Sequence, residues 1–197
     1  MSRSLRIVVA EDEVFMQKYL EETLTVLGHK VLAVVGMAKE LVERCKELRP
    51  DLVITDIRLP DGDGLSAAAD IYDNEPVPII VVSAFYDSKM IERAERSHVL
   101  AYLVKPIKQE DLEPSIAIAM RRFQEFRSLR EETDNLRQAL EDRKVIERAK
   151  GLLMKRASID EPEAFRRLQK LARDKNQRLV EIAQMIVTAE EAFQKTV

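Results

Sequence analysis

Three acids and a lysine in this chain stand directly after apolar runs, where they could do chemistry together. Glu11 and Asp12 follow Ile7–Ala10, Asp56 ends Asp51–Asp56, and Lys105 follows Leu100–Val104. A cluster of carboxylates repels itself unless a cation binds or protons are taken up. Mg²⁺ is usually held by one or two carboxylates together with phosphate oxygens. The residue types therefore indicate a divalent cation and a phosphoryl group, and argue against an apolar ligand.

A parallel sheet is predicted to position these residues. Over roughly the first 110 residues, strand and helix patterns alternate, which is typical of β-α-β units. The patterns predict strands at 5–10, 30–35, 51–55, 78–83 and 100–104, and helices at 13–27, 38–48, 64–72, 87–97 and from Gln109 onward. Ligands of open α/β sheets bind at the carboxyl ends of the strands. We therefore expect a doubly wound, five-stranded parallel domain that brings the acids and the lysine to one edge.

Four motifs, in order on four predicted strands, resemble the receiver domain of bacterial two-component response regulators. They are Glu11-Asp12, Asp56, Ser83-Ala84 and Lys105-Pro106, and the resemblance covers about residues 5–122. It implies a flavodoxin-like fold in which Asp56 takes a phosphoryl group from a phosphohistidine of a sensor histidine kinase. It also implies that Mg²⁺ is held by Glu11, Asp12, Asp56 and the backbone carbonyl of Arg58.

The same resemblance implies roles for the residues around the phosphoryl group. Ser83 hydrogen-bonds one phosphoryl oxygen, Lys105 neutralises another, Tyr102 is the aromatic switch, and the Lys105–Pro106 peptide is cis. The residues two positions beyond the phosphorylated aspartate and the hydroxyl residue control the access of hydrolytic water. Here they are Arg58 and Phe85, which are bulky and cannot act as a base, so we expect slow self-dephosphorylation.

A long helix is predicted to follow the receiver-like region. Between Asp111 and Arg156 only Pro114 and Gly151 interrupt the helical pattern. Apolar positions recur three or four residues apart at Ile116, Ala119, Phe123, Phe126, Leu129, Thr133, Leu136 and Leu140. This spacing favours a coiled-coil linker over residues 123–142, and with it a homodimer. The alternative is a single helix whose apolar side packs back on its own domain.

The C-terminal region, residues 143–197, is basic and predicted to form a small three-helix bundle. It carries 13 Lys and Arg against 8 Asp and Glu, although the whole chain has a net charge of −3. A break at 157–159 precedes Asp160, which with Glu163 forms a helix N-cap signature. Gly151 lies inside a predicted helix at a cost of about 1 kcal/mol. Close packing of another helix, or close approach of a ligand backbone, would explain it.

Residues from about 140 to 190 resemble the ANTAR domain, a family that binds paired RNA stem-loops and so prevents transcription termination. The resemblance rests on Ala149–Met154, Glu163–Phe165, Leu168, Ala172, Asn176, Leu179, Ile182-Ala183 and Ile186-Val187. Candidate RNA contacts are Arg143, Lys150, Arg173, Lys175, Asn176 and Arg178. Asn176 could instead cap the third helix, and Phe165 and Phe193 are expected in the core.

These patterns predict a response regulator with a receiver domain at 1–122, a linker at 123–142 and an RNA-binding domain at 143–197. We expect an antiterminator whose phosphorylation favours a homodimer. A DNA-binding transcription factor is the alternative, followed by a protein-interaction module. A metabolic enzyme is disfavoured because the acidic site consumes its phosphoryl donor stoichiometrically. The single cysteine, Cys45, and the lack of a signal peptide or membrane span favour the cytoplasm.

Overall fold

A computed structural model describes residues 4–84, 92–93 and 97–194, and it divides the chain into two compact units, Met1–Arg127 and Ser128–Val197. Residues 92–93 are helical, in agreement with the helix predicted at 87–97. Phe85 and most of that helix lie outside the described residues, as does the side chain of Phe193.

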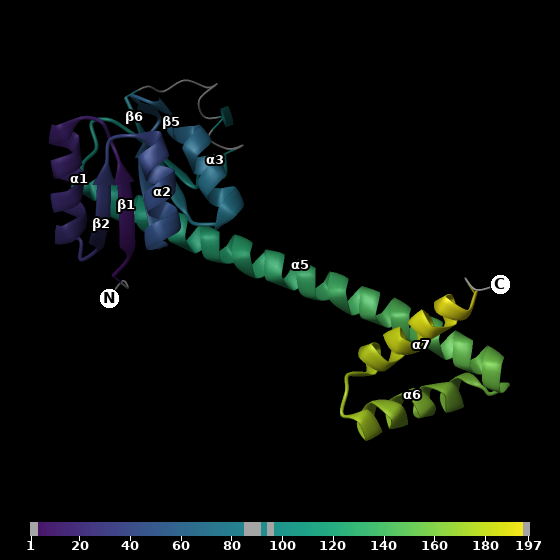
Figure 1. The fold of residues 1–197 in the computed structure, drawn as a ribbon. Coiled ribbons are helices and arrows are strands. Elements are labelled where there is room, and N and C mark those ends of the chain that lie inside the picture. Colours follow the sequence, from purple (N-terminus) through teal and green to yellow (C-terminus); the bar gives the residue numbers. More distant parts are fainter. Residues whose placement is uncertain (1–3, 85–91, 94–96, 195–197) are drawn as a thin grey trace. The chain divides into compact units, whose positions relative to one another are not determined.

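The first unit contains the predicted parallel sheet (Figure 1). Its strands are β1 (Arg6–Ala10), β2 (Lys30–Val35), β3 (Leu52–Asp56), β6 (Ile79–Ser83) and β7 (Ala101–Val104), in the order β2-β1-β3-β6-β7. Every pairing in this sheet is parallel. The order reverses its direction between β1 and β3, so the crevice between their carboxyl ends is a topological switch point. The predicted fold class is confirmed.

Helices cover both faces of the sheet because successive strand residues point to opposite sides. Ile7 and Val9 pack with α1 (Val14–Val26) and the start of α5 (Gln109–Ala157), whereas Val8 faces α2 (Ala38–Leu48) and α3 (Gly64–Asn74). These strand residues are fully buried. A short hairpin that the sequence did not predict, β4 (Arg58–Leu59) with β5 (Gly62–Asp63), joins β3 to α3.

The second unit packs the end of α5 against α6 (Glu161–Lys175) and α7 (Leu179–Gln194). Its core consists of Ala149, Leu168, Ala172, Ile182, Ala183 and Val187. The side chain of Asp160 accepts a hydrogen bond from the Glu163 amide, which confirms the predicted N-cap of α6. Asn176 ends α6 in the left-handed region, with φ of 52°, so it caps that helix rather than the following one.

The middle of α5 is exposed along its whole length. Every residue from 124 to 141 is exposed, and this stretch includes four large apolar side chains. The exposed fractions are 62% for Phe126, 60% for Leu129, 60% for Leu136 and 59% for Leu140.

Candidate functional site

Three carboxylates meet at the carboxyl edge of the sheet. Glu11 directly follows β1 and Asp56 ends the neighbouring strand β3, while Asp12 stands at the start of the loop to α1. One carboxylate oxygen from each lies within 4.8 Å of the others. Glu11 is 1% exposed and Asp56 is 7% exposed, whereas Asp12 is open to solvent. Two of the acids are thus buried at the edge of the sheet, and the third, close to them, is accessible to solvent.

Lys105, which follows β7, joins the two buried acids. Its Nζ donates a hydrogen bond to Asp56 Oδ2 at 2.6 Å and another to Glu11 Oε1 at 2.9 Å. The backbone amides of Glu13 and Arg58 donate to Glu11 Oε1 and Asp56 Oδ1, at 3.2 and 3.0 Å. The peptide between Lys105 and Pro106 is cis, as predicted. The lysine therefore binds both acids from the side of β7.

The acids have more negative charge than Lys105 neutralises. Burial raises the pKa of Glu11, and the hydrogen bond from Lys105 only partly opposes this effect. Burial lowers the pKa of Lys105, but its hydrogen bonds to Asp56 and Glu11 outweigh burial and raise it. Glu11 Oε2 is 2.7 Å from the ammonium, yet it is buried and accepts no hydrogen bond. An oxygen in this state fits coordination by a hard divalent cation.

Gly64, the first residue of α3, is part of this architecture, although the sequence argument did not assign it a role there. A Cβ at this position would overlap the backbone carbonyl oxygen of Asp56 and lie 2.9 Å from Thr55 Oγ1. The Gly64 amide donates to the carbonyl of Ile57 at 2.8 Å. Absence of a side chain therefore lets α3 begin directly against the end of β3. In the sequence, the signal that could have identified this role was a glycine that closely follows the acidic end of a strand.

Ser83, Tyr102 and Arg58 flank the acidic cluster. Ser83 ends β6, the strand next to β3, and it is 3% exposed. Its backbone carbonyl accepts a hydrogen bond from the Lys105 amide at 2.8 Å, which ties β6 to the loop that carries the lysine. Tyr102 lies on β7, half-buried against the α2–α3 side of the core. Arg58 lies on β4, two residues beyond Asp56, and its side chain is exposed.

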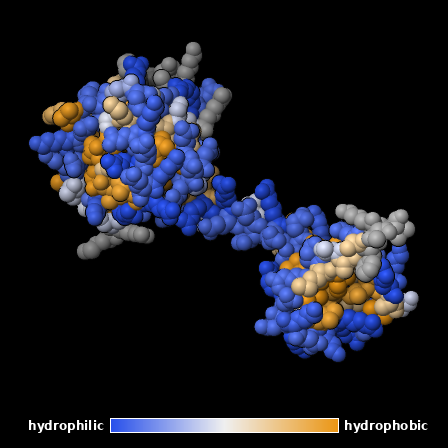
Figure 2. Space-filling view, in the orientation of Figure 1, coloured by the Kyte–Doolittle hydropathy of each residue, from blue (hydrophilic) through white to orange (hydrophobic). Residues whose placement is uncertain are grey.

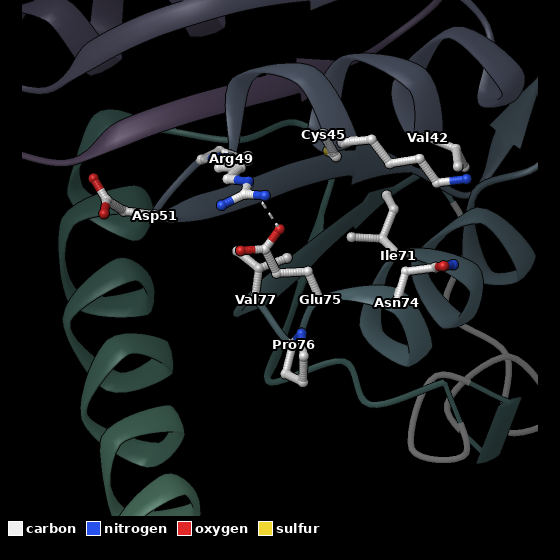
Figure 3. Close-up of a pocket in the computed structure, with 11 residues that line it drawn as sticks. Val42, Cys45, Arg49, Asp51, Ile71, Asn74, Glu75, Pro76 and Val77 are labelled. Carbon is white, nitrogen blue, oxygen red and sulfur yellow. Dashed lines mark ion pairs between the residues drawn. The ribbon is translucent and has the colours of Figure 1, made fainter.

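A cavity of about 240 Å³ lies at the opposite end of the sheet (Figure 3). Val42 and Cys45 of α2 and Ile71 of α3 line it, together with Arg49 and Glu75, which form an ion pair at 3.6 Å. Burial raises the pKa of the Cys45 thiol to about 12. Because the acids and Lys105 are at the other edge, this cavity is separate from their chemistry.

Most of the candidate RNA contacts lie on the surface of the second unit. Arg143, Arg173, Lys175, Asn176 and Arg178 are all exposed. The Arg178 guanidinium forms an ion pair with Asp142 at 3.2 Å, so the turn between α6 and α7 lies beside the α5 segment that carries Arg143. The fold thus brings residues from two distant segments of the sequence to one end of the bundle.

Lys150 has different surroundings from the other candidates. It is 7% exposed, and its Nζ forms ion pairs with Glu161 at 2.6 Å and Glu147 at 2.9 Å. These two hydrogen bonds raise the pKa of Lys150. The ammonium also lies 5.8 Å from the ring centroid of Phe165, which is 36% exposed, so the prediction of a core position for Phe165 was wrong. Lys150 connects α5 to the start of α6, and its ammonium is paired with two carboxylates whose side chains are more than half exposed.

Gly151, the neighbour of Lys150, is exposed, and a Cβ there would meet nothing within 4 Å. Close packing by another helix therefore does not explain this glycine.

None of the helices that the structure describes has an apolar stretch of the length that a bilayer crossing requires.

Comparisons with known proteins agree with this architecture. The family model of the response regulator receiver domain matches residues 7–117, and that of the ANTAR domain matches residues 134–187. The transcriptional regulatory protein PdtaR of Mycobacterium tuberculosis is 38% identical over 182 residues, which cover 92% of this chain and 89% of that protein. The chemotaxis protein CheY of Thermotoga maritima is 33% identical over 104 residues, covering 52% of this chain and 87% of that protein.

A solved structure shows the same fold in the first unit. The signal receiver domain of a modulated diguanylate cyclase from Desulfovibrio desulfuricans G20 aligns with a TM-score of 0.59 and 30% identity, over 62% of this chain and 98% of that one. The fold and the acidic edge define a two-component response regulator. Within that class, the chain belongs to the family that joins an N-terminal receiver domain to a C-terminal ANTAR domain.

Proposed function

We propose that this response regulator is phosphorylated on Asp56 by a sensor histidine kinase and then binds RNA hairpins that prevent transcription termination. The observation that carries the proposal is the buried pairing of Asp56 with Glu11 and Lys105, in a chain whose C-terminal unit matches the ANTAR model. The acidic cluster and the basic candidate RNA contacts lie in separate compact units. This division suits a protein in which one unit receives the signal and the other produces the response. We place the linker between them at residues 123–142.

In the phosphorylation step, Asp56 Oδ attacks the phosphorus of a phosphohistidine, and the P–N bond to the kinase imidazole breaks. Glu11, Asp12, Asp56 and the backbone carbonyl of Arg58 would hold Mg²⁺, which supplies neutralisation of phosphoryl charge. Lys105 already contacts Asp56 at 2.6 Å and neutralises a second phosphoryl oxygen. Ser83, buried at the end of the next strand, donates its hydroxyl to a third.

The new group adds about −1.5 to −2 units of charge next to Lys105 and Ser83. Both residues lie at ends of adjacent strands, β6 and β7, so their shift toward the phosphoryl group alters the surface that these strands support. Tyr102, half-buried on β7, turns inward when Ser83 moves. Arg58 and Phe85 restrict water and slow the loss of the phosphoryl group, as the sequence predicted.

A protein donor must contact the surface around Asp56. Val14 and Phe15, in the first turn of α1 and close in sequence to Glu11, are 77% and 80% exposed. Large apolar side chains at this exposure are suited to binding another protein. We assign them to docking of the kinase, beside the acid that its phosphohistidine must reach.

At the output end, Arg143, Arg173, Lys175 and Arg178 hold RNA phosphates, while Asn176 reads an unstacked loop base. Their common location beside the α6–α7 turn supports this assignment. Lys150 is left out of the set because its ammonium is already paired with Glu147 and Glu161. Phosphorylation favours a homodimer, and two linked bundles bind paired hairpins with a large gain in avidity.

The test has two readouts. Intact-mass spectrometry after treatment with acetyl phosphate and Mg²⁺ should show one phosphoryl group on the native chain and none on Asp56→Asn. RNA that co-purifies with the treated protein should be enriched in hairpins near terminators, compared with the same variant. Failure of the mass gain would refute the phosphorylation step. Gel shifts on duplex promoter DNA that exceed those on RNA hairpins would favour the alternative, a DNA-binding transcription factor.

A further inference from the structure

All but one of the polar atoms of Glu11 take part in hydrogen bonds. Its backbone amide donates to the carbonyl of Val35 at 2.9 Å. Its Oε1 accepts from Lys105 Nζ and from the Glu13 amide. Its backbone carbonyl accepts from Gln17 Nε2 at 2.6 Å. The exception is Oε2, the buried oxygen that fits a cation, so these contacts together decide where that oxygen lies.

Gln17 differs from the other partners of Glu11 because it is a side chain from outside the acidic cluster. It lies in the first turn of α1, where its own amide donates to the carbonyl of Glu13 at 2.9 Å. Its side chain is half-buried. A Cβ added at Gly36 would lie 3.7 Å from Gln17 Nε2 and 3.9 Å from the Glu11 carbonyl oxygen. The end of β2 therefore packs against this hydrogen bond from the side opposite to α1.

The carbonyl that Gln17 binds belongs to the peptide group between Glu11 and Asp12. A peptide group is planar, so its rotation changes the backbone angles of both residues and moves both side chains. The loop that contains it is short, and the N-cap residue of α1, Glu13, makes no side-chain hydrogen bond that would cap the helix. The Gln17 amide thus fastens the loop to the first turn of α1. One hydrogen bond sets the direction of two neighbouring carboxylates.

We propose that Gln17 is a positioning residue for the divalent cation, because it holds the Glu11–Asp12 peptide and so directs both carboxylates toward one ion. This inference rests on the part of the proposed function that assigns Mg²⁺ to Glu11, Asp12 and Asp56. Mg²⁺ demands nearly ideal octahedral geometry, so small displacements of its ligands reduce affinity. Loss of a group that orients metal ligands typically costs about 10–100-fold in affinity.

Gln17→Met tests the inference because methionine has a similar length but no hydrogen-bond donor. The dissociation constant for Mg²⁺ should rise about tenfold. It is obtained from the rise of the unfolding temperature of the receiver unit, in the full chain, over a series of Mg²⁺ concentrations. Gln17→Asn retains the carboxamide but is one methylene too short to reach the carbonyl. It should weaken Mg²⁺ binding in the same direction, and it provides the test if the methionine variant does not fold.

The matched control is Lys18→Met, which introduces the same side chain one residue further along α1. The Lys18 side chain is 76% exposed and pairs with Glu22 of the same helix at 3.8 Å. Hydrophilic residues cover much of the surface of the first unit in Figure 2, so loss of one exposed lysine should leave the dissociation constant for Mg²⁺ unchanged. A similar rise in the Lys18→Met and Gln17→Met variants would overturn the specific role of the Gln17 amide.

A second readout separates positioning from a general structural defect. The initial rate of the mass gain from acetyl phosphate is followed as Mg²⁺ is raised. In Gln17→Met the Mg²⁺ concentration that gives half of the maximal rate should rise about tenfold. The maximal rate itself should stay the same, because Asp56 and Lys105 are intact. A lower maximal rate at an unchanged half-saturating concentration would overturn the inference.

The same Mg²⁺ series distinguishes failure of this inference from failure of the proposed function. Stabilisation of the native chain by Mg²⁺, with an equal dissociation constant in Gln17→Met, would overturn the role of Gln17 and leave the proposed metal site standing. No effect of Mg²⁺ on the native chain would refute the proposed metal site, and the inference about Gln17 with it.

Discussion

Substitution of Gly64 by alanine offers a sharp test of how the helix layer supports the acidic site. An added Cβ would overlap the carbonyl oxygen of Asp56, and it would also lie 2.9 Å from Thr55 Oγ1. Both are parts of β3, which is fully buried between two neighbouring strands and cannot move aside freely. Forcing an extra methyl group into a packed site of this kind costs about 1–3 kcal/mol. The free energy of unfolding of the receiver unit should fall by about that amount.

The matched control is Gly62→Ala, two residues earlier in the same connection, where the added Cβ would lie at an ordinary 3.5 Å from Ala38 Cβ. Its effect should stay within about 0.5 kcal/mol. Amide hydrogen exchange measures both variants and follows each unit of the chain separately. Protection should fall along β3 and its neighbours in Gly64→Ala, while the C-terminal bundle keeps its protection. Equal effects of the two substitutions would refute the close approach of α3 to Asp56.

Four further predictions concern other parts of the molecule. Phe15→Ala should slow phosphotransfer from the cognate kinase at least about tenfold, as loss of an interface anchor does. It should leave phosphorylation by acetyl phosphate unchanged. Equal slowing with both donors would exclude a docking role. Without divalent cations, Asp56→Asn should be more stable to denaturant than the native chain, because one carboxylate charge leaves the cluster around Lys105. Mg²⁺ at ten times its dissociation constant should then stabilise the native chain by about 1.4 kcal/mol and the variant by less. The Cys45 thiol should resist alkylation at pH 8 until the protein unfolds. Burial raises its pKa from the usual 9.0 to about 12, so at high pH the thiol ionises in the unfolded chain before it does in the folded one. Its contribution to the free energy of unfolding should therefore be complete below pH 9 and be lost as the pH rises toward 12. Gly151→Ala should raise the stability of the C-terminal bundle by about 1 kcal/mol in thermal unfolding, since nothing lies within 4 Å of the added methyl group.

The sequence predicted the elements of the sheet closely because fully buried parallel strands are nearly continuous apolar runs. The strand at 30–35 and the helix at 38–48 have the predicted bounds, and the other strands differ by a residue or so at their ends. The hairpin of β4 and β5 was missed because strands of two residues have no measurable periodicity. The Lys105–Pro106 cis peptide followed from the family resemblance, since propensity alone does not select it.

At the sites, sequence reasoning found residue types but not their partners. Glu11, Asp56 and Lys105 were expected at one edge, and the structure joins all three by hydrogen bonds. Lys150 was a candidate RNA contact because basic side chains hold RNA phosphates. Its pairing with Glu161 depends on the sharp change of chain direction between α5 and α6. The sequence predicted the position of this break but not the direction in which α6 leaves it. Phe165 was expected in the core because it lies at an apolar position of the helical pattern. This periodicity does not reveal a contact with an ammonium ion.

One oxygen of Glu11 lies buried without a hydrogen bond, and under the proposed function Glu11 is a ligand of Mg²⁺. If Mg²⁺ must bind before Asp56 takes a phosphoryl group, as proposed above, phosphorylation depends on the supply of the ion as well as on the phosphoryl donor. The proposed function therefore predicts a smaller response to the same kinase activity when free magnesium falls. Under the proposed function, the concentration of free magnesium therefore sets how strongly the chain responds to a given amount of phosphoryl donor.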